Sequence, residues 1–135
     1  MARLTYVYDP LCGWCFGFVP TLRQFEQANP DVQIDVIPGG LVTGDRVGPY
    51  GDMLDYITSA APRMTETTGQ ALGAAFFEMM RQEETPLSIS APPSRSLGVS
   101  AFPTCLVTGE DGKVRGAITG IDDPGEFQKA FDALA

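Results

Sequence analysis

The sequence of 135 residues has no histidine, only three cysteines, and nine lysine and arginine residues against seventeen aspartate and glutamate residues. Its formal net charge of −8 argues against sequence-independent binding to nucleic acid, which requires a basic surface. The same negative charge disfavours an anionic membrane surface. An odd and small number of cysteines excludes a disulfide-stabilised scaffold. We therefore expect neither nucleic acid nor membrane as a partner.

A secretory signal and long apolar runs are also missing. Residues 1–9 do not show a charged segment followed by an apolar one, and no apolar run is long enough to span a bilayer. The proportions of 44% hydrophobic and 19% charged residues are typical of a globular domain. These features predict a single domain over residues 1–135 in a bacterial cytoplasm.

What the sequence does contain is a pair of cysteines, Cys12 and Cys15, placed where a predicted strand passes into a predicted helix. Three positions apart, the two residues share one helical face, so their sulfurs can meet in a disulfide. In the first turn, Cys12 would face unpaired backbone N–H groups and the positive end of the helix dipole, which favour a thiolate. This arrangement predicts a reversible redox pair.

Several residues near this pair have a second interpretation. Cys12 and Cys15 could form half of a zinc site, although only Cys105 and carboxylates would remain as further ligands. Cys105 is either a small buried hydrophobic residue or a resolving or metal-binding thiol. Asp9 either accepts protons during exchange or stabilises a turn beside Pro10.

Hydrophobic periodicity and turn residues predict a β-α-β unit, a helical interval and a β-β-α unit. The helix that begins at Cys12 is expected to bury Phe16, Val19, Leu22 and Phe25. An apolar stripe with Phe76 and Met80 predicts either core or a substrate groove. The expected strands are 3–8, 32–36, 102–108 and 113–119, the expected helices are 12–28, 52–61, 67–83 and 124–134, and 85–95 is expected to be an extended linker.

Three segments, spread over nearly the whole chain, resemble the FrnE-like subgroup of the DsbA family of bacterial thiol–disulfide oxidoreductases. This resemblance implies an α/β thioredoxin-like fold. The segments are Tyr8-Asp9-Pro10-Leu11-Cys12-Gly13-Trp14-Cys15, Pro38-Gly39-Gly40-Leu41 and Leu97-Gly98-Val99-Ser100-Ala101-Phe102-Pro103-Thr104.

The resemblance also assigns roles to individual residues. It implies that Cys12 is the exposed nucleophile, that Cys15 is the buried resolving cysteine, and that Pro103 is a cis-proline lying against them. Phe102 would pair its backbone with an extended substrate chain, and Trp14 would offer an apolar platform. The supporting positions are Gly13, Asp9 and Thr104.

The sequence departs from the DsbA pattern before Pro103. The helical insertion expected over residues 42–96 is shortened, and residues 91–96 are too rich in proline and serine to continue a helix. We interpret this stretch as a splice where part of the insertion is missing. A homodimer, domain-swapped or otherwise paired, could replace the missing helices.

The predicted activity is disulfide exchange with protein or peptide thiols, with glutathione or a thioredoxin-type protein as a further partner. It requires no cofactor besides the Cys12–Cys15 disulfide and no metal. Because Gly13-Trp14 supplies no cation, we expect a reduction potential between about −270 and −120 mV, the thioredoxin and DsbA values. The alternatives are a peptide-binding module without turnover and an enzyme similar to kappa-class glutathione transferases and isomerases, which have serine in place of Cys12.

Overall fold

The computed structural model describes residues 1–90, 99 and 101–135. The predicted order of strands and helices is confirmed, with further short elements inside the insertion. The elements are β1 (Arg3–Tyr8), α1 (Gly13–Ala28), β2 (Gln33–Pro38), η1 (Gly44–Arg46), β3 (Gly48–Pro49), η2 (Tyr50–Met53), α2 (Leu54–Thr68), α3 (Ala74–Arg81), β4 (Leu87–Ser88), β5 (Thr104–Thr108), β6 (Val114–Thr119) and α4 (Pro124–Leu134).

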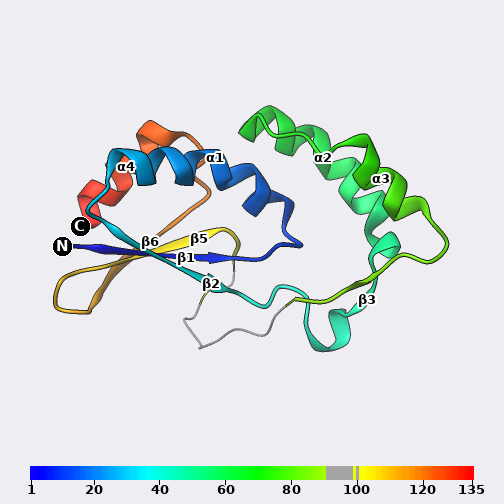
Figure 1. Ribbon diagram of the computed structural model, residues 1–135, viewed down its shortest axis with the longest axis horizontal. Helices are drawn as coiled ribbons and strands as arrows, with labels where there is room; N and C mark the ends of the chain where they lie inside the picture. Colours follow the sequence, from blue (N-terminus) through cyan, green and yellow to red (C-terminus); the bar gives the residue numbers. More distant parts are fainter. Residues whose placement is uncertain (91–98, 100) are drawn as a thin grey trace.

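The main sheet has the strand order β2-β1-β5-β6. β1 runs parallel to β2, as a β-α-β crossover requires, and antiparallel to β5, which pairs with β6 as a hairpin. α1 and α4 lie over the same face of this sheet, and α2 and α3 extend to one side of it (Figure 1). The carboxyl end of the central strand β1 therefore leads directly into the cysteine pair.

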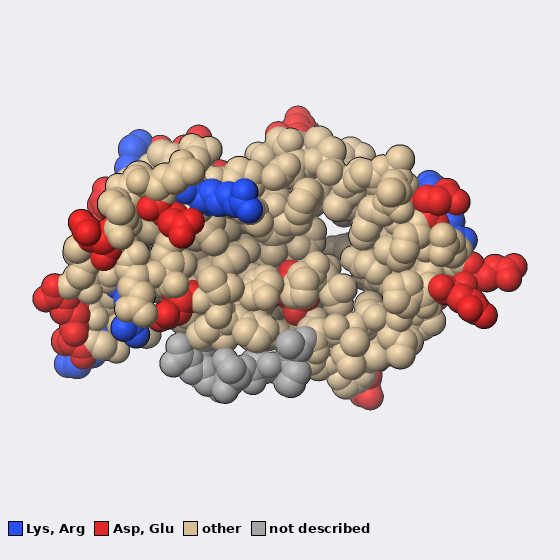
Figure 2. Space-filling model, viewed as in Figure 1, with Lys and Arg blue, Asp and Glu red and all other residues tan. Residues whose placement is uncertain are grey.

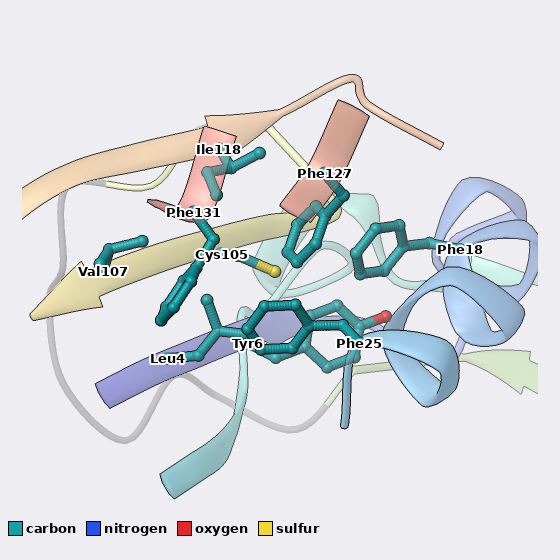
Figure 3. Packing of buried hydrophobic residues seen from close by; sticks show 9 residues of the cluster. All are labelled: Leu4, Tyr6, Phe18, Phe25, Cys105, Val107, Ile118, Phe127 and Phe131. Carbon is teal, nitrogen blue, oxygen red and sulfur yellow. The ribbon is translucent and has the colours of Figure 1, made fainter. Parts of the chain in front are cut away.

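The core lies between the sheet and the two helices that cover it (Figure 3). Alternation along the strands directs Leu4 and Tyr6 of β1 and Cys105 and Val107 of β5 into this layer. Phe127 of α4 meets two phenylalanines of α1 edge to face, with ring centroids 5.3 Å apart in each case. The buried cluster consists of Leu4, Tyr6, Phe18, Phe25, Cys105, Val107, Ile118, Phe127 and Phe131.

Asp123 begins α4 as predicted. Its side-chain carboxylate accepts a hydrogen bond of 2.9 Å from the backbone N–H of Glu126, and Pro124 occupies the first turn. Such a cap satisfies one of the backbone donors that a helix start leaves without a partner. The cap therefore places Phe127 and Phe131 at the positions from which they enter the core.

The predicted buried face of α1 is wrong in part. Phe16 is 43% exposed, whereas Cys15, Phe18 and Phe25 are each 3% exposed. The expected residues were spaced three apart, and each such step rotates by about 60° around a helix with 3.6 residues per turn. Phe16 and Phe25 consequently lie on opposite sides, and only Phe25 reaches the core.

The predicted helix boundaries inside the insertion are also wrong. α2 continues to Thr68, past the predicted end at residue 61, and contains Pro62. Proline removes one backbone donor, but it did not end this helix. The helix stops instead at Gly69, whose φ of 75° is left-handed and suits glycine. The next helix therefore begins at Ala74, seven residues later than predicted.

The extended segment predicted after α3 includes β4, which pairs antiparallel with β3. The backbone N–H of Ser90 donates to the carbonyl of Val42 at 2.7 Å, and so closes the insertion at its base. The remainder of the predicted linker and the interpreted splice, residues 91–96, lie outside the described residues. No helix in the described ranges combines the length and apolar character that crossing a bilayer demands.

Candidate active site

A buried carboxylate organises the loop that precedes the cysteine pair. Asp9 is 0% exposed, and its Oδ1 accepts a hydrogen bond of 2.9 Å from the Leu11 N–H. Its Oδ2 accepts another of 3.0 Å from the Leu41 N–H, and its backbone carbonyl accepts one of 3.0 Å from the Cys12 N–H. Asp9 thereby connects the loop before Cys12 to the loop after β2. These hydrogen bonds are those of a residue that stabilises a turn.

Cys12 and Cys15 occupy the start of α1, where the sequence places them. Cys12 is the N-cap and is half-buried, whereas Cys15 is buried one turn further along. A hydrogen bond donated by the Cys15 thiol, with further support from the backbone N–H groups of Cys15 and Trp14, lowers the pKa of Cys12 to about 6. The same hydrogen bond, together with burial, raises the pKa of Cys15. This arrangement favours the thiolate of Cys12 and the protonated thiol of Cys15 near neutral pH.

This difference predicts the pH profile of Cys12 alkylation. Because the thiolate is the reactive form, the rate with iodoacetamide should rise with pH through a midpoint near 6, where an ordinary cysteine titrates near 9. The Cys15→Ala variant loses the donor and should shift the midpoint upward, whereas Cys15→Ser keeps a hydroxyl donor and should shift it less. A wild-type midpoint near 9, measured by mass spectrometry of the Cys12 peptide, would contradict this assignment.

The segment around Pro103 reaches the cysteine pair from the other half of the chain. The Phe102–Pro103 peptide bond is cis, and the Phe102 carbonyl oxygen lies 3.8 Å from Cys12 Sγ. The Phe102 ring lies against Gly39, where a Cβ atom would come within 1.8 Å of it. Thr104 is buried and donates its hydroxyl to the Ala101 carbonyl at 2.7 Å. The structure thus brings Phe102, Pro103 and Thr104 of the third segment close to residues of the other two segments that the resemblance singled out.

Two tyrosines also lie close to the cysteines, and the sequence did not indicate them as site residues. The Tyr6 hydroxyl donates to the Cys15 carbonyl at 3.4 Å, and burial raises the pKa of this phenol, which keeps it protonated as a donor. Burial, followed by the negative charges of Cys12 and Asp9, raises the pKa of Tyr50. Tyr6 belongs to β1, whose alternation would have placed it on the core face. Tyr50 lies in the insertion, and no sequence signal pointed to it.

A groove of about 920 Å³ opens beside Cys12. Trp14 is half-buried in its wall, and Gly13 lies under Met64, whose Sδ would be 3.1 Å from an added Cβ. Phe76 lines the groove whereas Met80 is 2% exposed, so the stripe on α3 serves both groove and core. The lining is formed by Pro10, Leu11, Cys12, Gly13, Trp14, Phe16, Leu41, Val42, Arg46, Tyr50, Met53, Tyr56, Ile57, Ala60, Ala61, Met64, Ala71, Leu72, Gly73, Phe76 and Ser88.

Cys105 lies apart from this groove, in the hydrophobic core. It is 1% exposed, and burial raises the pKa of its thiol to about 12. The interpretation of Cys105 as a small buried hydrophobic residue is confirmed. Within residues 1–90, 99 and 101–135, no three Cys, Asp or Glu side chains come together as a metal-binding group.

No protein-family model and no curated protein matches the chain. Among solved structures, the cytosolic disulfide reductase DsbM from Pseudomonas aeruginosa is 32% identical with a TM-score of 0.51, and the match covers 59% of this chain and 37% of DsbM. DsbM with GSH is 30% identical with a TM-score of 0.53, over 65% of this chain and 41% of DsbM.

Another solved structure matches over nearly its full length. A protein proposed to be a disulfide isomerase, from Nitrosomonas europaea, is 18% identical with a TM-score of 0.58, and the match covers 98% of this chain and 96% of that one. The chain spans well under half the length of DsbM, so DsbM is a partial counterpart. The sheet order, the helices on it and this full-length match together show that the chain has a thioredoxin-like fold.

Proposed function

We propose that this protein is a thiol–disulfide oxidoreductase in which Cys12 attacks and Cys15 resolves. The observation that carries the proposal is the pairing of a half-buried Cys12, with a pKa of about 6, and a buried Cys15 thiol that donates to it. A lowered pKa in one thiol and a raised pKa in its neighbour suit exchange, because one sulfur is ionised as nucleophile while the other waits as a thiol.

In the proposed cycle, the Cys12 thiolate attacks one sulfur of a substrate disulfide. A mixed disulfide forms, and the other substrate sulfur leaves as a thiolate that takes a proton from water. Cys15 then gives its proton to solvent and its sulfur attacks Cys12 Sγ. The second substrate sulfur leaves as a thiolate that takes a proton from solvent. The substrate disulfide is reduced to two thiols, and the two cysteines are oxidised to one disulfide.

We propose reduction of disulfides as the direction, and protein or peptide disulfides as the substrates. The likeness to DsbM, described as a cytosolic disulfide reductase, supports both this direction and a cytoplasmic location. A Cys12 pKa of about 6 lies between about 3.5 for DsbA and about 7 for thioredoxin. That position favours a reduction potential between the two, less oxidising than DsbA.

We also propose roles in substrate binding for residues around the cysteine pair. The Phe102 carbonyl lies beside Cys12 Sγ and would accept a hydrogen bond from an extended substrate chain, with Pro103 next to it. Trp14 lines the groove wall as an apolar contact. We propose that residues 42–96 are a shortened helical insertion, whose described part from Val42 to Ser88 contributes much of the groove lining. We retain the FrnE-like subgroup as part of this proposal.

A trapped intermediate tests the proposed order of attack. The reduced Cys15→Ser variant cannot resolve its mixed disulfide, so incubation with oxidised insulin should yield a stable covalent adduct at Cys12, found by mass spectrometry of tryptic peptides. The wild-type protein should show little adduct, and the variant that also carries Cys12→Ser should show none. An adduct located at Cys105 would contradict the proposal.

A further inference from the structure

Tyr6 brings a buried hydroxyl group close to the cysteine pair from the central strand β1. Its side chain is 5% exposed, and its ring stacks on that of Tyr8 with centroids 5.7 Å apart and lies tilted against that of Phe18 at 5.6 Å. In Figure 3 the hydroxyl oxygen of Tyr6 points toward α1, the helix that contains Cys15. Close packing on both sides of the ring therefore fixes one polar atom beside Cys15.

The Tyr6 hydroxyl is only weakly engaged by the backbone. It donates to the Cys15 carbonyl at 3.4 Å, which is longer than the about 2.7–2.8 Å of an ordinary O–H···O bond. It also hydrogen-bonds the Cys15 side chain, as does the backbone N–H of Asp9, so two buried donors meet at one sulfur. A thiol sulfur is a weak acceptor, whereas a thiolate is a strong one. The two donors therefore suit the ionised form of Cys15.

The balance of interactions at Cys15 changes during the proposed cycle. In the reduced protein, the hydrogen bond to Cys12, followed by burial, raises the pKa of Cys15, and the donors from Asp9 and Tyr6 act in the opposite direction. Once Cys12 is joined to substrate in a mixed disulfide, it no longer has the negative charge that retains the Cys15 proton. The largest cause of the raised pKa is then gone, and the two donors act against burial.

Tyr6 can act as a hydrogen-bond donor but not as a base. Burial, followed by the negative charge of Cys15, raises the pKa of its phenol, and Cys105 of β5 and Cys12 act in the same direction. The phenol therefore keeps its proton near neutral pH. The Asp9 carboxylate has each of its oxygens bound by a backbone N–H group of a neighbouring loop. The Cys15 proton accordingly goes to solvent, as in the proposed cycle.

The charge of the whole chain makes these local donors important. The formal net charge of −8 opposes the formation of a further buried anion. Most Asp and Glu side chains on the face shown in Figure 2 gather toward the two ends of the molecule, and the surface between them is largely uncharged. The sequence has no histidine, and the described groups that act most on the pKa of Cys15 include no cation. Neutral hydrogen-bond donors therefore supply the stabilisation that a Cys15 thiolate receives.

We infer that Tyr6 is a positioning residue for the resolving step, in which its hydroxyl donates a hydrogen bond to the Cys15 sulfur as that sulfur becomes a thiolate. The inference rests on the proposed disulfide exchange and adds a residue to its second half. In this step Cys15 releases its proton to solvent and its sulfur bonds to Cys12 Sγ. The bond between Cys12 Sγ and the substrate sulfur breaks, and its electron pair leaves with the substrate thiolate. Tyr6 neither gains nor loses a proton.

The test separates the two halves of the exchange with dithiobis(2-nitrobenzoate), a disulfide that gives a coloured thiolate. Reduced protein in slight excess should release one thiolate as Cys12 attacks and a second as Cys15 resolves the mixed disulfide. Stopped-flow absorbance follows both phases, and the second should not depend on protein concentration. Tyr6→Phe removes only the hydroxyl. Near neutral pH it should slow the second phase by about threefold to tenfold, the range of one hydrogen bond, and leave the first unchanged.

The pH profile of the second phase distinguishes this role from a purely structural one. The rate rises as Cys15 ionises, and loss of a donor to the thiolate raises the pKa of that thiol. The midpoint of the profile should therefore be higher by about 0.5–1 in Tyr6→Phe, because a tenfold change in ionisation corresponds to one pH unit. Tyr8→Phe is the matched control. It makes the same change in the ring stacked on Tyr6 and should leave both phases and the midpoint as in the wild-type protein.

Three outcomes would overturn the inference about Tyr6. The first is a second phase in Tyr6→Phe with the wild-type rate and midpoint. The second is an equal slowing of both phases, and the third is an effect of the same size in Tyr8→Phe, since ring packing would then be the cause. If the wild-type protein showed no second phase that is independent of concentration, the proposed function itself would fail, which is a separate outcome.

Discussion

Replacement of Cys12 by serine is expected to abolish disulfide reduction. A serine hydroxyl is not ionised near neutral pH and cannot form a mixed disulfide, so the first exchange step is lost. In the insulin turbidity assay with dithiothreitol, the rate should fall to that of dithiothreitol alone. Cys15→Ser should also lose most turnover, but through accumulation of the mixed disulfide at Cys12.

The matched control is Cys105→Ser, the same chemical change at the third cysteine. Cys105 is 1% exposed in the hydrophobic core, so its replacement should leave the insulin rate nearly unchanged. It should instead lower the free energy of unfolding by about 1–3 kcal/mol, because a hydroxyl is buried among apolar groups. Turnover that survives in Cys12→Ser, or is lost in Cys105→Ser while the protein stays folded, would rule out the mechanism.

Phe127→Ala is expected to cause the largest loss of stability among single core substitutions. Phe127 is 1% exposed and meets Phe18 and Phe25 edge to face, so alanine leaves a cavity between α1 and α4. Phenylalanine-to-alanine changes of this kind cost about 3–5 kcal/mol. Equilibrium unfolding in urea, monitored by far-ultraviolet circular dichroism, should show a lower midpoint with an unchanged slope.

Phe16→Ala provides the comparison for this loss. Phe16 lies on the same helix as Phe18 but is 43% exposed, so the same substitution removes little buried area there and should cost less than about 1.5 kcal/mol. A similar loss in both variants would show that Phe16 is packed as tightly as Phe127, against its observed exposure. The two variants therefore test whether the observed orientation of α1 holds in solution.

Local patterns in the sequence determined the order of the main elements. Alternation over residues 3–8 predicted β1 with its observed bounds, and Asp123-Pro124 predicted the start of α4 because capping depends only on nearby residues. The position of Cys12 and Cys15 at a helix start followed in the same way from their neighbours. Cys105 was interpretable as a core residue because a lone cysteine on a strand is more often a small buried hydrophobic residue.

Tertiary contacts decided the features that join distant parts of the chain. The faces of α1 depend on Phe127 of α4 and on α2, where Thr68 approaches Gly17 so closely that an added Cβ would lie 2.6 Å from a side-chain atom. The helix boundaries of the insertion depend on the same packing, since α2 continues through Pro62. No periodicity within either segment encodes these contacts.

The active site combines both kinds of information. The Cys12–Cys15 spacing predicted a redox pair with a favoured Cys12 thiolate, because an N-terminal helical position stabilises that form. The proposed roles of nucleophile and resolving thiol came from the resemblance. Three further positions depend on the folded chain. Asp9 joins two loops, Tyr50 lies near Cys12, and Arg46 lines the groove. The sequence by itself therefore predicted the chemistry that we propose for the cysteine pair. The tertiary structure decided which groups stand opposite it, because those groups are separated along the chain and meet only when the chain folds.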